Sequence, residues 1–156
     1  RFPNAIHWSS AVQWHSAMHP NAREKASYVT NYLQAIQDSG KLKFVEKEEL
    51  GMKNMEIEFV FGHTESMMLC HIYKGKQTIS YCADLIPSHH HIKLPYIMAY
   101  DIRPMDSLKE KTIFLEKAIE NNHILFFEHD KNIECCTLKR TEKGIEFDNL
   151  MKLSDI

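Results

Sequence analysis

The sequence lacks the features that mark several specialised classes of protein. Its 21 acidic and 19 basic residues leave a formal net charge of −2, so no overall field attracts nucleic acid or an anionic membrane. It has no apolar stretch long enough to span a bilayer, no glycine-rich phosphate loop and no basic stripe interleaved with aromatic residues. We therefore expect a protein that binds neither nucleic acid nor membranes.

Cysteine is scarce, and its spacing does not form a disulfide framework. Cys70 and Cys82 lie in apolar runs, Cys135 and Cys136 are adjacent, and no C-x-x-C occurs. This pattern favours small buried hydrophobic residues in a reducing compartment, so we expect a cytoplasmic protein. No secretory signal pattern opens the chain. Because the first residue is Arg1 and not Met, we expect a further segment before it.

What is present suits one globular domain over residues 1–156. The chain is 44% hydrophobic and 26% charged, and a chain of this length can bury a core without disulfide or metal cross-links. Apolar runs with a period of two predict strands, and runs with helical spacing predict helices. The expected strands are 41–46, 55–61, 67–73, 78–83, 124–127, 133–138 and 145–147.

Capping patterns place the helices. Ser10 is the expected N-cap of the first helix and Asn21 of the second. Asp106 or Ser107, with Glu110 as its capping-box partner, is the expected N-cap of the third. The expected helices are 10–18, 21–39 and 106–121, and the segment 85–104 is expected to be an ordered loop.

Three potential metal ligands each follow the C-terminal end of a predicted strand: His63, Asp84 and His129. Strand ends that share one rim can aim short side chains at a single point. Imidazole nitrogen and carboxylate oxygen suit zinc, iron or manganese. Each residue also has an ordinary interpretation, because Asp84 could serve a turn or cap a helix and a histidine could simply end a strand. Spacing alone leaves both interpretations open.

The motifs around these residues resemble those of the metallo-β-lactamase superfamily. Gly62-His63-Thr64 resembles its G-H-T motif, Ala83-Asp84 its later G-D element with Ala in place of Gly, and residues 127–130 its final strand-end histidine. The order matches, as do the intervals of 21 and 45 residues between the three candidate ligands. The opening Phe2-Pro3-Asn4-Ala5, followed by Trp14 in a short helix, resembles lactonase-like or glyoxalase II-like members. Residues 84–87, 91–95 and 100–101 resemble a bacterial subgroup.

The resemblance implies an α+β fold, a four-layer αββα sandwich to which this chain supplies mainly the C-terminal αβ half. It implies two divalent metal ions, with zinc favoured over iron or manganese. His63 would ligate the first ion, His129 the second, and Asp84 would bridge both as the catalytic ligand. A bridging hydroxide would attack a small ester-like substrate, with a lactone or thioester favoured. The resemblance implies a bacterial hydrolase of small molecules, and it is compatible with a homo-oligomer.

The sequence departs from that family in one respect. None of its ten histidines forms the H-x-H-x-D-H motif that supplies the remaining ligands, and the cluster His89-His90-His91 does not replace it. We therefore expect the site to need the missing N-terminal half of the fold. The alternative is a non-catalytic binding or oligomerisation module with an incomplete metal site. The residues that precede Arg1 would discriminate between the two.

Two further residues are candidates for a supporting role outside the coordination shell. Thr64, beside His63, could hydrogen-bond a ligand, although capping its own turn is the equally good alternative. His91 could orient a ligand through a hydrogen bond, whereas the ordinary interpretation is a solvated loop residue.

Overall fold

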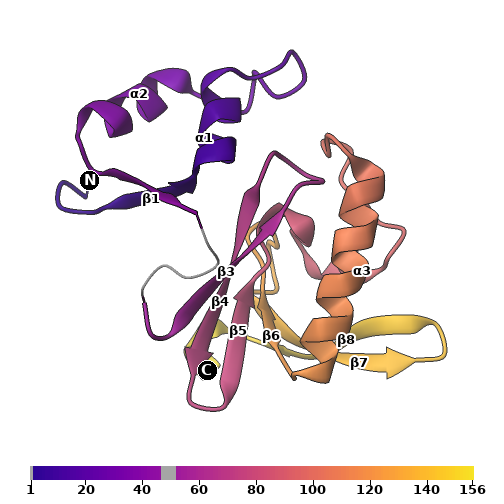
Figure 1. Cartoon of the computed structure of the whole chain (residues 1–156). Helices are drawn as coiled ribbons and strands as arrows, with labels where there is room; N and C mark the ends of the chain where they lie inside the picture. The colour runs from indigo at the N-terminus through magenta and orange to yellow at the C-terminus, as the bar shows by residue number, and fades with distance from the viewer. Residues whose placement is uncertain (1, 47–51) are drawn as a thin grey trace.

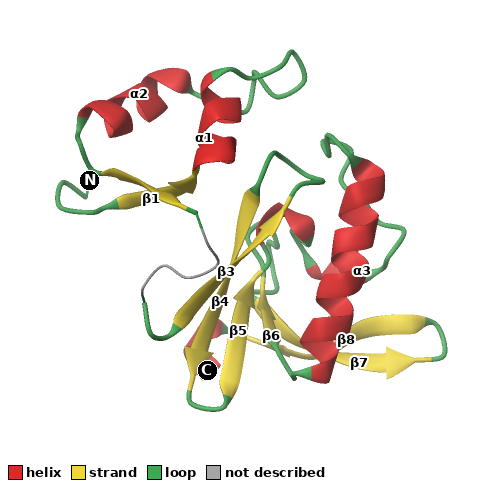
Figure 2. Ribbon diagram, in the orientation of Figure 1, coloured by secondary structure: helices red, strands yellow, loops and turns green. Residues whose placement is uncertain are grey.

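The structure, a computed structural model, describes residues 2–46 and 52–156. It consists of two parts (Figure 1). The smaller N-terminal part combines two helices with a two-stranded sheet, and the larger C-terminal part places one long helix on a six-stranded sheet. Figure 2 shows that long helix, α3 (Pro104–Glu120), lying over the sheet.

The strands of the larger sheet follow the order β3-β4-β5-β6-β7-β8. Their bounds are Met55–Val60, Met67–Lys74, Gln77–Tyr81, Ile124–Phe126, Cys135–Thr141 and Gly144–Met151. Strands β5 and β6 run parallel, and every other neighbouring pair is antiparallel. Strands β3, β5 and β6 therefore end at the same edge of the sheet, which is the shared rim that the sequence predicted.

The core lies between α3 and the sheet. Phe114, Leu115 and Ala118 of the helix are buried in one apolar cluster with Leu69 of β4 and Leu125 of β6. Burying each large apolar side chain stabilises the fold by about 1.5–3 kcal/mol. This cluster fixes the helix over the strands whose ends carry the candidate ligands.

Helix α3 begins earlier than we expected, so the predicted cap at Asp106 or Ser107 is wrong. The helix starts at Pro104, whose fixed φ suits the first helical position. The Glu110 carboxylate does not complete a capping box. It accepts hydrogen bonds of 2.8 and 3.0 Å from two backbone N–H groups just after β3, so a contact between distant segments replaces the local one.

The N-terminal part contains β1 (His7–Ser10), α1 (Ala11–Met18), α2 (Thr30–Asp38) and β2 (Leu42–Val45), with β1 and β2 paired in parallel. The cap at Ser10 is confirmed, because its Oγ accepts a hydrogen bond of 2.9 Å from the N–H of Gln13. Strand β1 was not predicted. Its sequence, His-Trp-Ser-Ser, has neither apolar alternation nor a β-branched residue.

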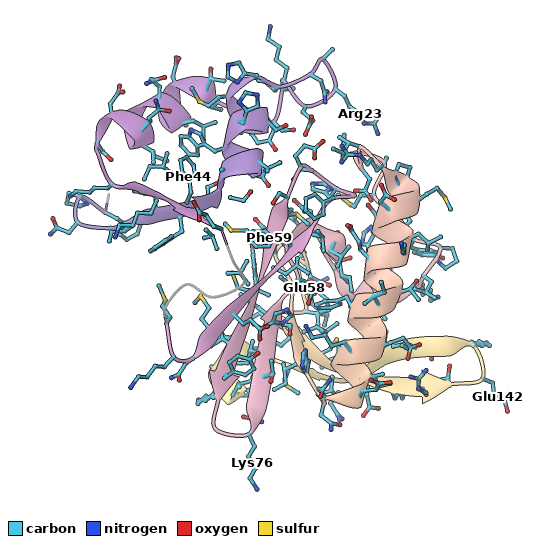
Figure 3. All side chains as sticks on the ribbon, in the orientation of Figure 1. Arg23, Phe44, Glu58, Phe59, Lys76 and Glu142 are labelled. Carbon is cyan, nitrogen blue, oxygen red and sulfur yellow. The ribbon has the colours of Figure 1, made fainter. Side chains whose placement is uncertain are left out.

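The second expected helix, 21–39, is only partly correct. Within a turn, the side-chain oxygen of Asn21 accepts hydrogen bonds from the backbone N–H groups of Arg23 and Glu24. The helix begins only at Thr30. Arg23 extends toward the loop before α3 (Figure 3) and donates to the carbonyl of Asp101 at 3.3 Å. This long-range contact stabilises turns in a segment whose periodicity alone favours a helix.

The ordered loop expected at 85–104 is confirmed. Short 3-10 turns occur at η1 (Ala83–Leu85), η2 (His89–Ile92) and, at the end of the chain, η3 (Leu153–Asp155). The buried Lys111 of α3 anchors the loop, because its Nζ donates three hydrogen bonds to backbone carbonyls. The acceptors, at 3.2, 3.1 and 2.8 Å, are His91, Lys93 and Tyr96. Burial lowers the pKa of Lys111 to about 8.

The four cysteines are free thiols. Three are buried and Cys70 is partly exposed, close to the expectation of small buried hydrophobic residues. Burial raises the pKa of the Cys82 and Cys136 thiols, so both stay uncharged. Across the described ranges, no helix combines the length and the apolar character needed to cross a membrane.

Candidate metal centre

The three ligands predicted from the sequence meet at the common edge of the larger sheet. Nε2 of His63 lies 3.3 Å from Oδ2 of Asp84, and Nε2 of His129 lies 3.2 Å from Oδ1 of the same carboxylate. Asp84 therefore stands between two imidazoles that belong to different strand ends. The parallel course of β5 and β6 produces this proximity, because Asp84 follows the first strand and His129 the second.

His63 is positioned by a close approach between the end of β3 and the start of α3. Gly62 has no room for a side chain, since a Cβ there would lie 2.2 Å from the backbone nitrogen of Ser107. The N–H of Arg103 donates to the carbonyl of Gly62 at 2.8 Å, and Glu110 accepts from the N–H of Gly62 at 3.0 Å. The close packing against Ser107 thus explains why the G-H-T sequence has glycine at position 62 in this chain.

Asp101 holds the ring of His63. Its buried carboxylate lies 2.8 Å from Nδ1 of the imidazole, which leaves Nε2 directed at Asp84. Burial opposes protonation of His63, but hydrogen bonds to Asp101 and Asp84 and their negative charges outweigh it and raise the pKa to about 9. A carboxylate on the far nitrogen orients an imidazole and makes it a more basic metal ligand.

A strained turn carries Asp84. Ala83 has a φ of 43°, a left-handed conformation that costs a residue other than glycine about 1–2 kcal/mol. The hydrogen bond with His63 lowers the pKa of Asp84, so its carboxylate is ionised. Its Oδ1 is buried and has no hydrogen-bond partner among the described residues, although His129 lies beside it.

His129 is fixed through its backbone. Its N–H donates to the carbonyl of Pro87 at 3.0 Å. The next residue, Asp130, accepts the N–H of His89 at 3.0 Å and two N–H groups of the following turn at 3.0 and 2.9 Å. The imidazole of His129 remains accessible, with 58% of the side chain exposed, so the backbone is held while the ring is free to bind.

This geometry suits a divalent metal ion. Two ligands that each lie about 2 Å from a tetrahedral zinc ion are about 3.3 Å apart, which agrees with the separations of 3.3 and 3.2 Å at Asp84. Oδ1 of Asp84, which no residue in the described ranges hydrogen-bonds, is a buried polar atom that a cation would satisfy. The two imidazoles and the carboxylate therefore fit the ions that the resemblance implied.

Comparisons with known proteins agree with this fold. No protein-family profile and no curated protein matches the sequence, but solved structures do. A probable metal-dependent hydrolase from Staphylococcus aureus is 25% identical, with a TM-score of 0.83 over 96% of this chain and 53% of that one. AidC, a dizinc quorum-quenching lactonase, is 22% identical, with a TM-score of 0.78 over 97% of this chain and 57% of its own. The hydrolase AbOPH in the beta-lactamase superfamily is 16% identical, with the same TM-score and coverages.

This chain carries part of a metallo-β-lactamase fold. It spans about half the length of the solved structures that it resembles. The fold implied by the motif resemblance is confirmed, and so is the αβ half that the resemblance assigned to this chain. In this metallo-β-lactamase fold, the six-stranded sheet with α3 forms that half.

Glu128 lies in the candidate site of this partial metallo-β-lactamase fold and was not predicted. Its carboxylate, together with Asp84 and His129, offers ligand atoms that all lie within 4.8 Å of one another. The hydroxyl of Tyr81 donates a hydrogen bond to Glu128. Burial and this neighbouring carboxylate raise the pKa of Tyr81, so the phenol stays protonated. The available signal was an acidic residue directly before a candidate histidine.

The two predicted supporting residues make hydrogen bonds elsewhere. The hydroxyl of Thr64 donates to Gln13 of α1 at 3.4 Å, and Nδ1 of His91 lies 2.8 Å from the Ser88 hydroxyl. Within the described residues, neither is hydrogen-bonded to His63, Asp84 or His129, so their supporting role stays a prediction. Asp101 has the contact that we expected of such a residue.

A cavity of about 430 Å³ opens beside the candidate ligands of the metallo-β-lactamase fold. Its wall combines residues of both parts of the chain. Besides His63 and Asp84, the lining includes Gln13, Tyr28, Met67, Met68 and Tyr81. The cavity therefore combines apolar and aromatic side chains with polar and charged ones beside the candidate ligands.

Proposed function

We propose that this protein is a metal-dependent hydrolase of small ester-like substrates, with a lactone or a thioester as the preferred class. The observation that carries the proposal is the convergence of His63, Asp84 and His129, with separations of 3.3 and 3.2 Å at Asp84. His63 would hold one ion and His129 the other, and Asp84 would bridge both. The similarity to a probable metal-dependent hydrolase and to a dizinc lactonase supports the same proposal.

When bound, two divalent ions, with zinc favoured, would supply a hydroxide nucleophile near neutral pH and polarise the scissile carbonyl. The residues of the chain prepare the site for this chemistry. Asp101 orients His63, and the ionised Asp84 presents both oxygens to the imidazoles. The apolar side of the cavity, with Met67 and Met68, would hold an acyl group next to the ions.

Three ligands are fewer than two ions require, because a catalytic zinc takes about three protein ligands. In this proposal, further ligands come from outside residues 1–156, in keeping with similar structures that are about twice as long. The four free thiols and the Staphylococcus aureus source of one similar structure support a bacterial enzyme of the cytoplasm.

The proposal is tested with the full-length protein. Metal content is measured by mass spectrometry, and hydrolysis is assayed on a panel of lactones, thioesters and phosphodiesters. We expect two ions per chain and turnover of a lactone or thioester. Asp84→Asn should lower metal content and hydrolysis together, because a neutral amide bridges two cations poorly, whereas Asp148→Asn, an exposed change in β8, should alter neither. A protein without metal or turnover would favour the non-catalytic module.

A further inference from the structure

Glu128 lies at the rim of the cavity, and its position has a physical cause in the sheet. The parallel register pairs Tyr81 of β5 with Phe126 of β6, and the two rings pack with centroids 5.8 Å apart. Glu128 lies two residues after Phe126, just beyond the end of β6. The hydroxyl of Tyr81 donates a hydrogen bond to Oε2 of Glu128. An exposed carboxylate that would otherwise be free in solvent is thereby held beside Asp84.

A buried oxygen beside Glu128 accepts no hydrogen bond from any described residue. This oxygen is Oδ1 of Asp84, which is buried next to His129, and Glu128 contributes an oxygen within 4.8 Å of ligand atoms of both residues. Two carboxylates at this range repel each other, and a cation between them would relieve that repulsion. One imidazole and two carboxylates form a donor set that suits zinc or manganese.

We propose that Glu128 is a further ligand of the ion held by Asp84 and His129, and that Tyr81 positions it. The inference rests on the proposed metal site and adds two residues to it. With Glu128, one imidazole and two carboxylates from this chain would surround a single ion, and their negative charges would offset part of its positive charge. Tyr81 acts through Glu128, since its hydroxyl fixes one carboxylate oxygen and leaves the other for the ion.

The test measures metal binding and does not depend on turnover. Metal-stripped full-length protein is titrated with Zn²⁺ by calorimetry and with Co²⁺ by absorption, which reports the coordination of the ion. Glu128→Gln keeps the shape of the side chain and removes its charge. Glu142→Gln is the matched control, because it removes the same charge at the tip of the β7–β8 hairpin (Figure 3). This tip lies at the opposite end of β7 from the residues that pair with the end of β6.

We expect Glu128→Gln to weaken one ion at least tenfold and to change the Co²⁺ spectrum, because lost ligands and their supports cost 10–100-fold or more in metal affinity. Tyr81→Phe should weaken the same ion by a smaller factor, and Glu142→Gln should bind like the unchanged protein. Circular dichroism confirms that each variant is folded.

The outcomes separate this inference from the proposed function. If Glu128→Gln binds as tightly as Glu142→Gln while Asp84→Asn loses the ion, Glu128 is not a ligand and the hydrolase proposal stands. If the unchanged protein binds neither Zn²⁺ nor Co²⁺, the metal site itself is wrong and both proposals fail.

Discussion

The carboxylate of Asp101 lies 2.8 Å from Nδ1 of His63, while Nε2 of the same ring lies 3.3 Å from Asp84. One imidazole thus connects a buried carboxylate to the candidate bridging ligand. Asp101 precedes α3 and His63 follows β3, so the packing of the helix on the sheet sets the direction of this ring. The contact predicts how the imidazole titrates and binds.

Asp101→Asn should lower the pKa of His63 from about 9 toward its ordinary value, because the variant removes one of two negative charges that favour the imidazolium. It should also weaken metal binding about 10–100-fold. Nuclear magnetic resonance titration of the metal-free protein measures the first effect, and calorimetry measures the second. Asp106→Asn, an exposed change on α3, is the control. A His63 that still titrates near pH 9 in the first variant would refute the assignment.

Gly62→Ala should lower the free energy of unfolding by about 2–3 kcal/mol, because the new Cβ would meet the backbone of Ser107, which cannot move away alone. Gly75→Ala is a useful comparison. It stands in open space with a φ of +64°, so it should cost only about 1 kcal/mol of backbone strain. Urea denaturation measures the free energy of unfolding of both variants. Equal losses would show that the backbone at Ser107 moves to accommodate the new Cβ.

Lys111→Met should destabilise the protein by about 2–4 kcal/mol, since it leaves three backbone carbonyls without their charged donor. The loop should loosen more than the rest of the molecule. Hydrogen exchange is expected to accelerate between residues 89 and 97 while the amides of β4 stay protected. Lys109→Met, which alters an exposed lysine on the same helix, should leave exchange in the loop unchanged, and similar behaviour of the two variants would count against the anchor.

A largely buried series of hydrogen bonds crosses β3, β4 and β5 and ends at His123, the residue before β6. Nε2 of His71 lies 3.1 Å from Glu58, its Nδ1 lies 2.8 Å from the Ser80 hydroxyl, and that hydroxyl lies 2.9 Å from Nδ1 of His123. With neutral imidazoles, the donors run in one direction: His71 donates to Glu58, Ser80 to His71 and His123 to Ser80. Burial, with a smaller contribution from the positive charge of Lys117, lowers the pKa of His123 to about 4.

His123 should therefore make the fold sensitive to acid. Between about pH 6.5 and pH 4, the imidazole is protonated in the unfolded chain but not in the folded chain. The free energy of unfolding therefore decreases by up to about 3 kcal/mol as the pH is lowered through this range. His123→Asn keeps a donor for Ser80 and does not titrate, so it should lose most of this dependence. Denaturation at pH 7 and pH 4.5 measures it, with the exposed His90→Asn as control. A variant as acid-sensitive as the control would contradict the assignment.

The sequence predicted the parts of the site that depend on local pattern. His63, Asp84 and His129 each follow a strand that its own residues specify, and the parallel course of β5 and β6 brings the last two together. All seven expected strands occur. The sequence predicted that the three side chains would share one edge of the sheet. It could not predict the distances between them, because these depend on the order of the strands.

What could not be predicted depends on contacts between distant segments. Asp101 binds an imidazole 38 positions away, and Glu110 binds backbone after β3 rather than its own helix. Arg23 likewise reaches a carbonyl 78 positions away, and its segment forms turns where a helix was expected. Periodicity describes a segment alone, whereas these side chains are satisfied only once the fold has formed.

His63, Asp84 and His129 come from three separate strand ends, so an unfolded chain has no preformed pocket for a cation. An ion bound there would recognise the native state alone, and its concentration would shift the folding equilibrium by about 2.7 kcal/mol at one hundred times its dissociation constant. Metal supply would then set the stability of the fold as well as the occupancy of the site.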